Sequence, residues 1–165
     1  MNITPTNIER TFDENVLLVT KTDTKGKITY ANRAFMDIVN MNEDTLIGAA
    51  HNIIRHPDMP KIIFKYLWKY LQNEQEIHAY VKNISADGSY YWVMANVTPS
   101  YKAGKVIGYH SVRRKPTPHS LEIIIPLYSE LLAAERSGGI SASEKVMNSL
   151  LEKKGVNYDE FILSF

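Results

Sequence analysis

The sequence has 165 residues, of which 44% are hydrophobic and 22% are charged, with 19 basic and 18 acidic side chains and a net charge of +1. A chain of this size can bury one sizeable core, and so small a net charge gives no broad attraction to nucleic acid or to anionic lipid. The absence of cysteine excludes disulfides, thiolate catalysis and cysteine-ligated metal clusters, and it is typical of a reducing compartment.

The amino terminus and the hydropathy of the chain indicate a cytoplasmic protein. The first residues, MNITPTNIERTF, contain no apolar core of a signal peptide. No later run approaches the roughly 20 apolar residues that are needed to span a bilayer. We therefore expect no direct insertion into a membrane.

A β-hairpin followed by short helices is predicted first along the chain. Residues 15–23 are β-branched and apolar, a turn follows, and residues 27–32 resume the strand pattern. After the hairpin, Asn32 can cap a short helix with the sequence RAFMDIVNM, and residues 43–46 can form a further helical turn.

Residues 61–72 (KIIFKYLWKYLQ) are predicted to form a longer helix, because apolar side chains recur at helical spacing after Pro60. From Glu76 the period of the pattern switches to two, which predicts strands. Three long strands follow, separated by turns at DG and YKAGK, and the last of them covers residues 105–114.

This order of elements indicates an α+β fold with a single five-stranded antiparallel sheet, helices on one face and further helices at the C-terminus. We divide the chain into an N-terminal segment (residues 1–11), a central domain (12–116) and a C-terminal helical extension (117–165). In the extension, Pro126 is expected to kink or restart the helix, and residues 137–139 (SGG) are expected to break it.

Asn83 is a polar residue at an inward-facing position of a predicted strand. It shares the parity of Ile77, Ala79 and Val81, which should face the core. A buried amide without partners is costly, so Asn83 must meet either a protein group or a bound ligand. Parity alone leaves both interpretations open: a core asparagine bonded to the helical layer, or an amide that bonds the edge of a flat heterocycle.

Residues 51–61, HNIIRHPDMPK, gather two histidines, an arginine, an aspartate and two prolines, and several kinds of site compete for this cluster. A metal centre is poorly supported, because His51 and His56 have one nearby carboxylate and no further clustered ligand. Catalysis would need a nucleophile motif, paired carboxylates or a phosphate-binding glycine loop, so we expect no enzyme. A polar clamp for a charged ligand is the third interpretation.

Six motifs in order, HNIIRHPDMPK, a tryptophan-containing helix, VKN, DGSYYWV, AN and IGYHSVR, resemble the FAD-binding PAS domain of aerotaxis receptors over roughly residues 10–136. The resemblance implies a PAS fold and a redox or energy-taxis sensor that holds FAD non-covalently. Aerotaxis receptors continue into a membrane segment and a signalling coiled coil, whereas this sequence does not. We therefore expect a stand-alone energy-taxis PAS protein of the CetB kind, which signals in trans to a membrane-bound chemoreceptor.

The resemblance also implies which residues bind the cofactor, and no metal ligand is among them. They are Asn32, His51, Arg55, His56, Asp58, Trp68 and Asn83. Arg55 would bind the pyrophosphate of FAD, together with free N–H groups at the start of helix 61–72. Asp58 would orient Arg55 or cap that helix, the two histidines would line the mouth of the cleft, and Asn83 would bond the isoalloxazine ring.

Alternative roles stay open for single residues, and alternative ligands for the pocket. Asn32 is equally well explained as a helix cap, and Trp68 with Phe64 as an aromatic pair of the core. The family usually has a tryptophan where this chain has Ile77, which removes one stacking partner of the ring. A haem-binding PAS sensor, for which one axial histidine suffices, and a ligand-free PAS interaction adaptor are the alternative functions.

The opposite face of the predicted sheet carries an apolar patch that something must cover. By parity it consists of Tyr80, Ile84, Trp92 and Met94. The helices of the C-terminal extension, a second copy of the chain in a homodimer, and the cytoplasmic part of a membrane-bound chemoreceptor are the three candidates. We expect such a receptor to recruit the protein to the membrane.

Overall fold

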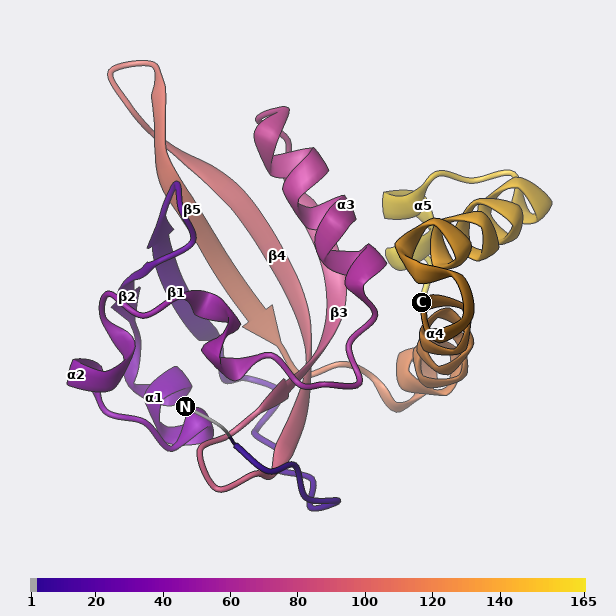
Figure 1. The fold of residues 1–165 in the computed structure, drawn as a ribbon. Coiled ribbons are helices and arrows are strands. Elements are labelled where there is room, and N and C mark those ends of the chain that lie inside the picture. Colours follow the sequence, from indigo (N-terminus) through magenta and orange to yellow (C-terminus); the bar gives the residue numbers. More distant parts are fainter. Residues whose placement is uncertain (1–2) are drawn as a thin grey trace.

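The computed structural model describes residues 3–165 and contains one five-stranded antiparallel sheet with the strand order β2-β1-β5-β4-β3 (Figure 1). The strands are β1 (Leu18–Asp23), β2 (Ile28–Ala31), β3 (Ile77–Ile84), β4 (Tyr90–Lys102) and β5 (Lys105–Arg114). The last strand, β5, returns to pair with the first strand, β1, in the middle of the sheet. The predicted α+β fold with a single antiparallel sheet is thereby confirmed.

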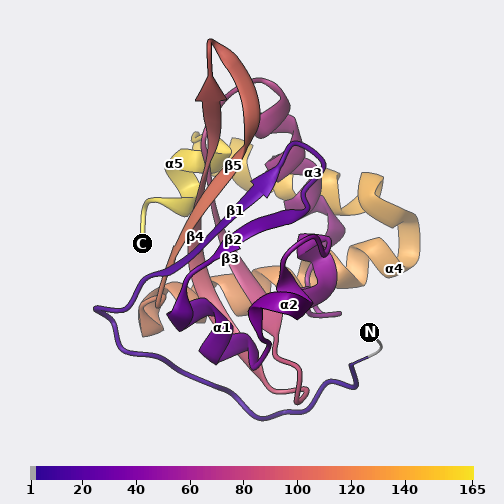
Figure 2. The same ribbon diagram turned by 90° about the vertical axis from the view of Figure 1, so that its left-hand side faces the viewer.

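Four helical segments connect β2 to β3 and cover one face of the sheet, which we call the inner face (Figures 1 and 2). They are α1 (Arg33–Val39), α2 (Glu43–Leu46), the 3-10 helix η1 (His51–Ile54) and α3 (Lys61–Gln72). Asn32 begins α1 by accepting a hydrogen bond from the backbone N–H of Phe35. Helix α3 begins directly after Pro60, as the sequence predicts, and buries Ile62 and Ile63 against the sheet.

The register of the strands places a row of polar side chains on the inner face. Three cross-strand pairs belong to this row: Asn83 with Tyr91, Ala95 with Arg113, and Thr20 with Ser111. Asn83 is 3% exposed and lies on the side of the sheet that faces η1 and α3, which confirms the inward direction that its parity predicts. The small side chain of Ala95 leaves room between the sheet and the helices.

The C-terminal extension consists of α4 (Pro118–Lys154) and α5 (Tyr158–Ile162). Helix α4 runs through Pro126 and does not restart there, whereas the non-helical backbone of Gly138 and Gly139 confirms the break predicted at this point. A capping box between Asn157 and Glu160 begins a further helix in the last nine residues, 157–165. No helix within residues 3–165 combines the length and the apolar character that crossing a bilayer requires.

The extension covers the apolar patch on the outer face of the sheet. Tyr128 of α4 donates a hydrogen bond of 2.6 Å from its hydroxyl to the backbone carbonyl of Tyr80, and its ring lies 5.9 Å from that of Trp92. Phe165 stacks on Tyr80 with a ring separation of 5.8 Å. Of the three candidates expected to cover this patch, it is the C-terminal extension of the same chain that covers it in the structure.

Candidate functional site

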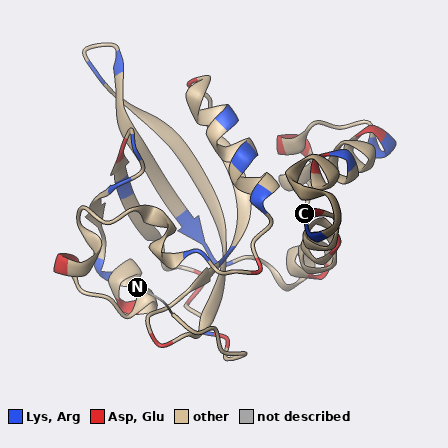
Figure 3. Ribbon diagram, in the orientation of Figure 1, with Lys and Arg blue, Asp and Glu red and all other residues tan. Residues whose placement is uncertain are grey.

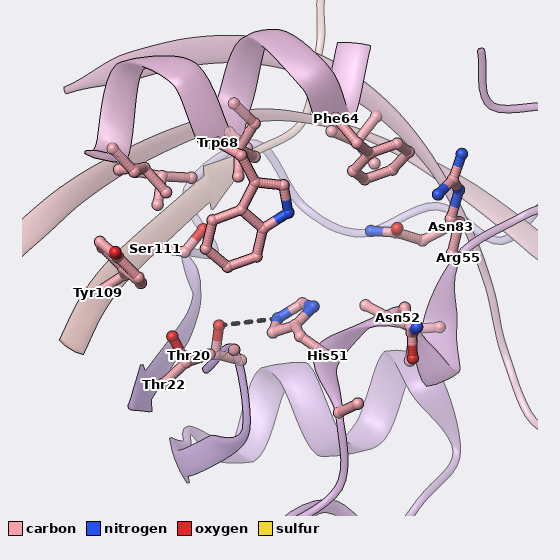
Figure 4. A pocket seen from close by; sticks show the side chains of 18 of the residues that line it. Thr20, Thr22, His51, Asn52, Arg55, Phe64, Trp68, Asn83, Tyr109 and Ser111 are labelled. Atoms are coloured by element: carbon pink, nitrogen blue, oxygen red, sulfur yellow. Dashed lines mark hydrogen bonds between the residues drawn. The ribbon is translucent and has the colours of Figure 1, made fainter. Parts of the chain in front are cut away.

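A cavity of about 270 Å³ lies between the inner face of the sheet and the helices η1 and α3 (Figure 4). Its apolar wall includes Ile54, Leu67, Leu71, Val81 and Val97, and its polar wall includes Thr20, His51, Asn83, Ser111 and Arg113. A mostly apolar hollow with a few convergent polar groups is typical of small-molecule sites, which usually measure about 300–1,000 Å³. The cavity is therefore a candidate binding pocket of a size that suits a ring system.

Trp68 forms one wall of the pocket, so it is more than a residue of the closed core. Its side chain extends from α3 over the cavity (Figure 4), and the residue is 37% exposed. The indole meets Tyr109 edge-on, with 5.8 Å between the ring centroids. It also reaches the β1–β2 turn, where a Cβ added to Gly26 would lie 3.4 Å from the indole.

Asn83 lies at the end of the pocket that also contains Arg55 and Phe64 (Figure 4). Its backbone forms an isolated bridge with that of Arg55, which fixes the loop before α3 against β3. The neighbouring Tyr91 is fully buried, and its hydroxyl has no hydrogen-bond partner among the described residues. Burial raises the pKa of Tyr91, so this hydroxyl stays protonated and can donate a hydrogen bond.

Arg55 lies at the edge of the pocket with its guanidinium stacked over the ring of Phe64, 3.9 Å from the ring centroid. One N–H group, at Nη2, donates a weak hydrogen bond of 3.5 Å to the backbone carbonyl of Met59. Partial burial lowers the pKa of Arg55, and the carboxylate of Glu135 opposes that shift. The remaining donors of the guanidinium are available for an anionic group of a ligand.

His51 belongs to a cluster that the sequence indicates only in part. Its Nε2 lies 2.7 Å from Nη2 of Arg113 and 3.1 Å from Oγ1 of Thr20. Burial and the nearby Arg113 lower the pKa of His51 to about 3, so the ring is neutral and Nε2 accepts these hydrogen bonds. The inward parity of Arg113 in the motif IGYHSVR is the sequence signal for this residue.

His56 and Asp58 are not among the residues that line the pocket. His56 is 3% exposed, and its Nδ1 accepts a hydrogen bond of 3.1 Å from the backbone N–H of Asp58. Asp58 forms an ion pair of 2.8 Å with Lys82, instead of orienting Arg55 or capping α3 as the resemblance implies. The two residues shape the loop that carries Arg55, and direct contact with a cofactor stays a prediction for both.

The start of α3 is occupied by a carboxylate of the extension, which corrects the expectation of free N–H groups there. Glu135 of α4 accepts hydrogen bonds from the backbone N–H groups of Lys61 at 3.0 Å and of Ile62 at 2.9 Å. Lys65, one of the lysines along α3 (Figure 3), also pairs with Glu144 of α4 at 2.6 Å. The extension therefore holds the helix end that the resemblance assigns to a pyrophosphate.

Asn32 and Ile77 also lie outside the lining of the pocket. The side-chain oxygen of Asn32 accepts hydrogen bonds from the backbone N–H groups of Phe35 and Val19, and its amide nitrogen donates to the carbonyl of Leu17. These bonds agree with a structural cap, and a role of Asn32 beside the cofactor stays a prediction. Ile77 is fully buried in the core.

The pocket lies within a segment that matches a known family. A sequence profile of the family described as PAS fold matches residues 28–113, which is more than half of the chain. The protein therefore belongs to the PAS family. It is also 34% identical over 142 residues to the aerotaxis receptor of Escherichia coli (strain K12), and this match covers 86% of the chain and 27% of the receptor.

Solved structures show the same fold at low sequence identity. A light-oxygen-voltage domain studied with a flavin analogue has a TM-score of 0.59 at 16% identity, over 69% of this chain and 86% of that chain. The PAS domain of a protein from Colwellia psychrerythraea has a TM-score of 0.56 at 19% identity, over 63% of this chain and 90% of that chain. The light-state LOV domain of the photoreceptor Aureochrome1 has a TM-score of 0.57 at 18% identity, over 67% and 88%.

Proposed function

We propose that this PAS protein binds FAD non-covalently in the inner-face pocket and senses the redox state of the cell, without turning over a substrate. The observation that carries the proposal is the buried amide of Asn83 at a cavity inside a PAS domain related to an aerotaxis receptor. An amide offers both donors and an acceptor, which suits the alternating N–H and C=O groups at the edge of a flavin ring.

The residues of the pocket fit a flat heterocycle with polar edges. Trp68 supplies an aromatic wall, and the hydroxyl of Ser111, which has no partner among the described residues, is the kind of group that a ligand satisfies. A volume of about 270 Å³ suits the ring of FAD and not the whole molecule. The remainder of FAD would lie outside the cavity, where Arg55 is available for the pyrophosphate.

In this proposal the redox signal passes through the sheet to the extension. A bound flavin supplies electron transfer and a change in the charge and protonation of its ring. Strand β3 connects the two sides, because Asn83 points into the pocket and Tyr80 contacts Tyr128 and Phe165 of the extension. We propose that the protein is cytoplasmic and that its extension then acts in trans on a membrane-bound chemoreceptor. This receptor would recruit the protein to the membrane. A homodimer is a second assembly that we propose to test.

The absorbance of the purified protein, followed by titration with FAD, tests the proposal. We expect a two-banded flavin spectrum that bleaches on reduction, and a melting temperature that rises with added FAD because FAD binds the native state. A single intense Soret band would assign haem instead, although Nε2 of His51 would have to leave Arg113 to serve as an axial ligand. A colourless protein without a thermal shift at saturating FAD would contradict both and indicate a ligand-free adaptor.

A further inference from the structure

Arg113 is a buried cation whose partners are all neutral. The residue is 5% exposed, and its guanidinium donates hydrogen bonds of 3.0 and 3.1 Å to Oγ1 of Thr20 and one of 2.7 Å to Nε2 of His51. Its central carbon lies 5.4 Å from the ring centroid of Phe35. No carboxylate of residues 3–165 lies within ion-pair distance of it.

The cluster around Arg113 keeps a net positive charge at neutral pH. Burial lowers the pKa of Arg113 to about 10, which still leaves the guanidinium protonated. His51 cannot supply a counter-charge, because it is neutral and already uses Nε2 to accept from Arg113. A buried charge without an opposite charge is costly, so proteins normally pair such groups. A negative charge on a bound ligand would supply the partner that residues 3–165 do not provide.

The space beside Arg113 is the pocket itself. Arg113, Thr20 and His51 all line it, and so does Ser111, two residues before Arg113 on the same face of β5. Ser111 is 6% exposed, and its hydroxyl has no hydrogen-bond partner among the described residues. In Figure 4, Ser111 and Thr20 lie on one side of Trp68, and Asn83 and Arg55 lie on the other. The pocket therefore has polar groups on both sides of Trp68, with Ser111 and Thr20 on the side away from Asn83.

We infer that Arg113 and Ser111 form an oxyanion subsite, which binds a ring oxygen of the ligand that carries negative charge. Thr20 and His51 hold the guanidinium in place and leave its charge unneutralised. The inference rests on the proposed function for its ligand class, a planar heterocycle with ring carbonyl groups. Each electron that enters such a ring from an external donor without a proton adds one negative charge, and the guanidinium favours this form by Coulomb attraction.

If this subsite exists, Arg113 makes the reduced ligand bind more tightly than the oxidised ligand. Removing one charge-assisted contact weakens binding by roughly ten- to a hundredfold. When the contact with Arg113 is removed, the oxidised ligand should lose much less affinity than the reduced ligand. A tenfold difference between the two losses equals a fall in midpoint potential of about 30 mV for a two-electron couple. Arg113 thereby sets the redox range to which the sensor responds.

The test measures the midpoint potential of FAD bound to the whole chain, by titration with a chemical reductant in the presence of a reference dye. Arg113→Met, which keeps the apolar length of the side chain, should lower the potential by at least the tenfold equivalent, whereas Arg113→Lys, which keeps the charge, should retain most of it. Arg114→Gln is the matched control, because Arg114 is exposed and follows Arg113 directly. A wild-type potential in Arg113→Met would overturn the subsite.

Two further results keep the test decisive. If Arg113→Met does not fold, the subsite still predicts a lower potential in Ser111→Ala, and an unchanged potential there would overturn it. If the wild type binds no FAD, the proposed function fails and the subsite is tested with nitrate, a planar anion, as the probe. Nitrate should then raise the melting temperature of the wild type more than that of Arg113→Met and Ser111→Ala, and equal shifts would overturn the inference.

Discussion

The two faces of the sheet are built from the same strands but are covered in different ways. On the outer face, Trp92 and Tyr80 are buried under aromatic side chains of the extension. On the inner face, the helices leave a cavity of about 270 Å³ with a buried cation, Arg113, and with the hydroxyl of Ser111, which has no hydrogen-bond partner within residues 3–165. The outer face is filled by the chain itself, whereas the inner face keeps the space in which we propose that a ligand binds.

Strand β3 makes the two faces dependent on each other. Successive side chains of a strand point to opposite faces, so a shift that moves Asn83 in the pocket also moves the residues that contact the extension. A second connection passes around the edge of the sheet, because Glu135 of α4 caps the helix that carries Trp68. Changes at either face should therefore separate the roles of the pocket and of the extension.

Breaking the covered outer face should have the largest effect on stability. In Trp92→Glu a carboxylate replaces a side chain that is 8% exposed and lies against Tyr128. We expect a loss of about 3 to 5 kcal/mol in the free energy of unfolding, measured in urea. Ile107→Glu is the control, since Ile107 is 52% exposed on β5 and should change stability by no more than about 0.5 kcal/mol. A stable Trp92→Glu protein would show that the extension does not pack there.

Changes at the inner face should affect ligand binding instead. Arg55→Ala should weaken FAD binding about ten- to a hundredfold, because it removes a charge-assisted donor from the edge of the pocket. Asn83→Asp should retain more FAD but make its reduction harder, since a carboxylate beside the ring disfavours anionic reduced forms. Fluorescence titration and the midpoint potential measure the two effects, with Arg33→Ala, at an exposed position, as the control. Wild-type affinity and potential in both variants would refute the assignment of the pocket.

Removing Glu135, which connects α4 to the start of α3, should have a smaller effect on stability. Glu135→Ala leaves the first N–H groups of α3 without their carboxylate partner, which should cost about 0.5 to 2 kcal/mol. Hydrogen exchange at Lys61 and Ile62 should accelerate, whereas the control Glu130→Ala, at an exposed position of the same helix, should leave it unchanged. Slow exchange in both variants would show that the cap does not hold α3.

The ion pair between Asp58 and Lys82 should give the smallest effect, and a pH-dependent one. The hydrogen bond from Lys82 holds the pKa of Asp58 below its ordinary value of 3.8. A carboxyl group with a lowered folded-state pKa stabilises the protein above its unfolded pKa and loses this contribution as the pH falls through the folded pKa. Asp58→Asn should lower the melting temperature slightly at neutral pH and not in strong acid. A difference that persists unchanged in acid would contradict this assignment.

Local patterns explain why much of the fold could be predicted from the sequence. The alternation around Asn83 and the helical spacing after Pro60 each reflect a single element, so β3, α3 and the inward amide could be identified from neighbouring residues. The helix α5 was also readable in principle, because Asn157 and Glu160 have the spacing of a capping box.

The contacts that define the site could not be predicted in the same way, because they join distant segments. Glu135 meets Ile62 across 73 positions of the sequence, and Arg113 meets His51 across 62. The expected roles of Asp58, orienting Arg55 or capping α3, were wrong for the same reason, since only the position of β3 brings Lys82 to it. Parity indicated an inward direction for Arg113 but not the absence of a carboxylate beside it.

Hydrogen exchange of the FAD-bound protein, compared between the oxidised and the chemically reduced state, tests most directly whether a redox change in the pocket reaches the extension. We expect altered exchange in β3, in the first turn of α3 and in α4 around Tyr128, with unchanged exchange in α2, which lies away from these contacts. Identical exchange of β3 and α4 in the two states, with FAD bound in both, would contradict this expectation.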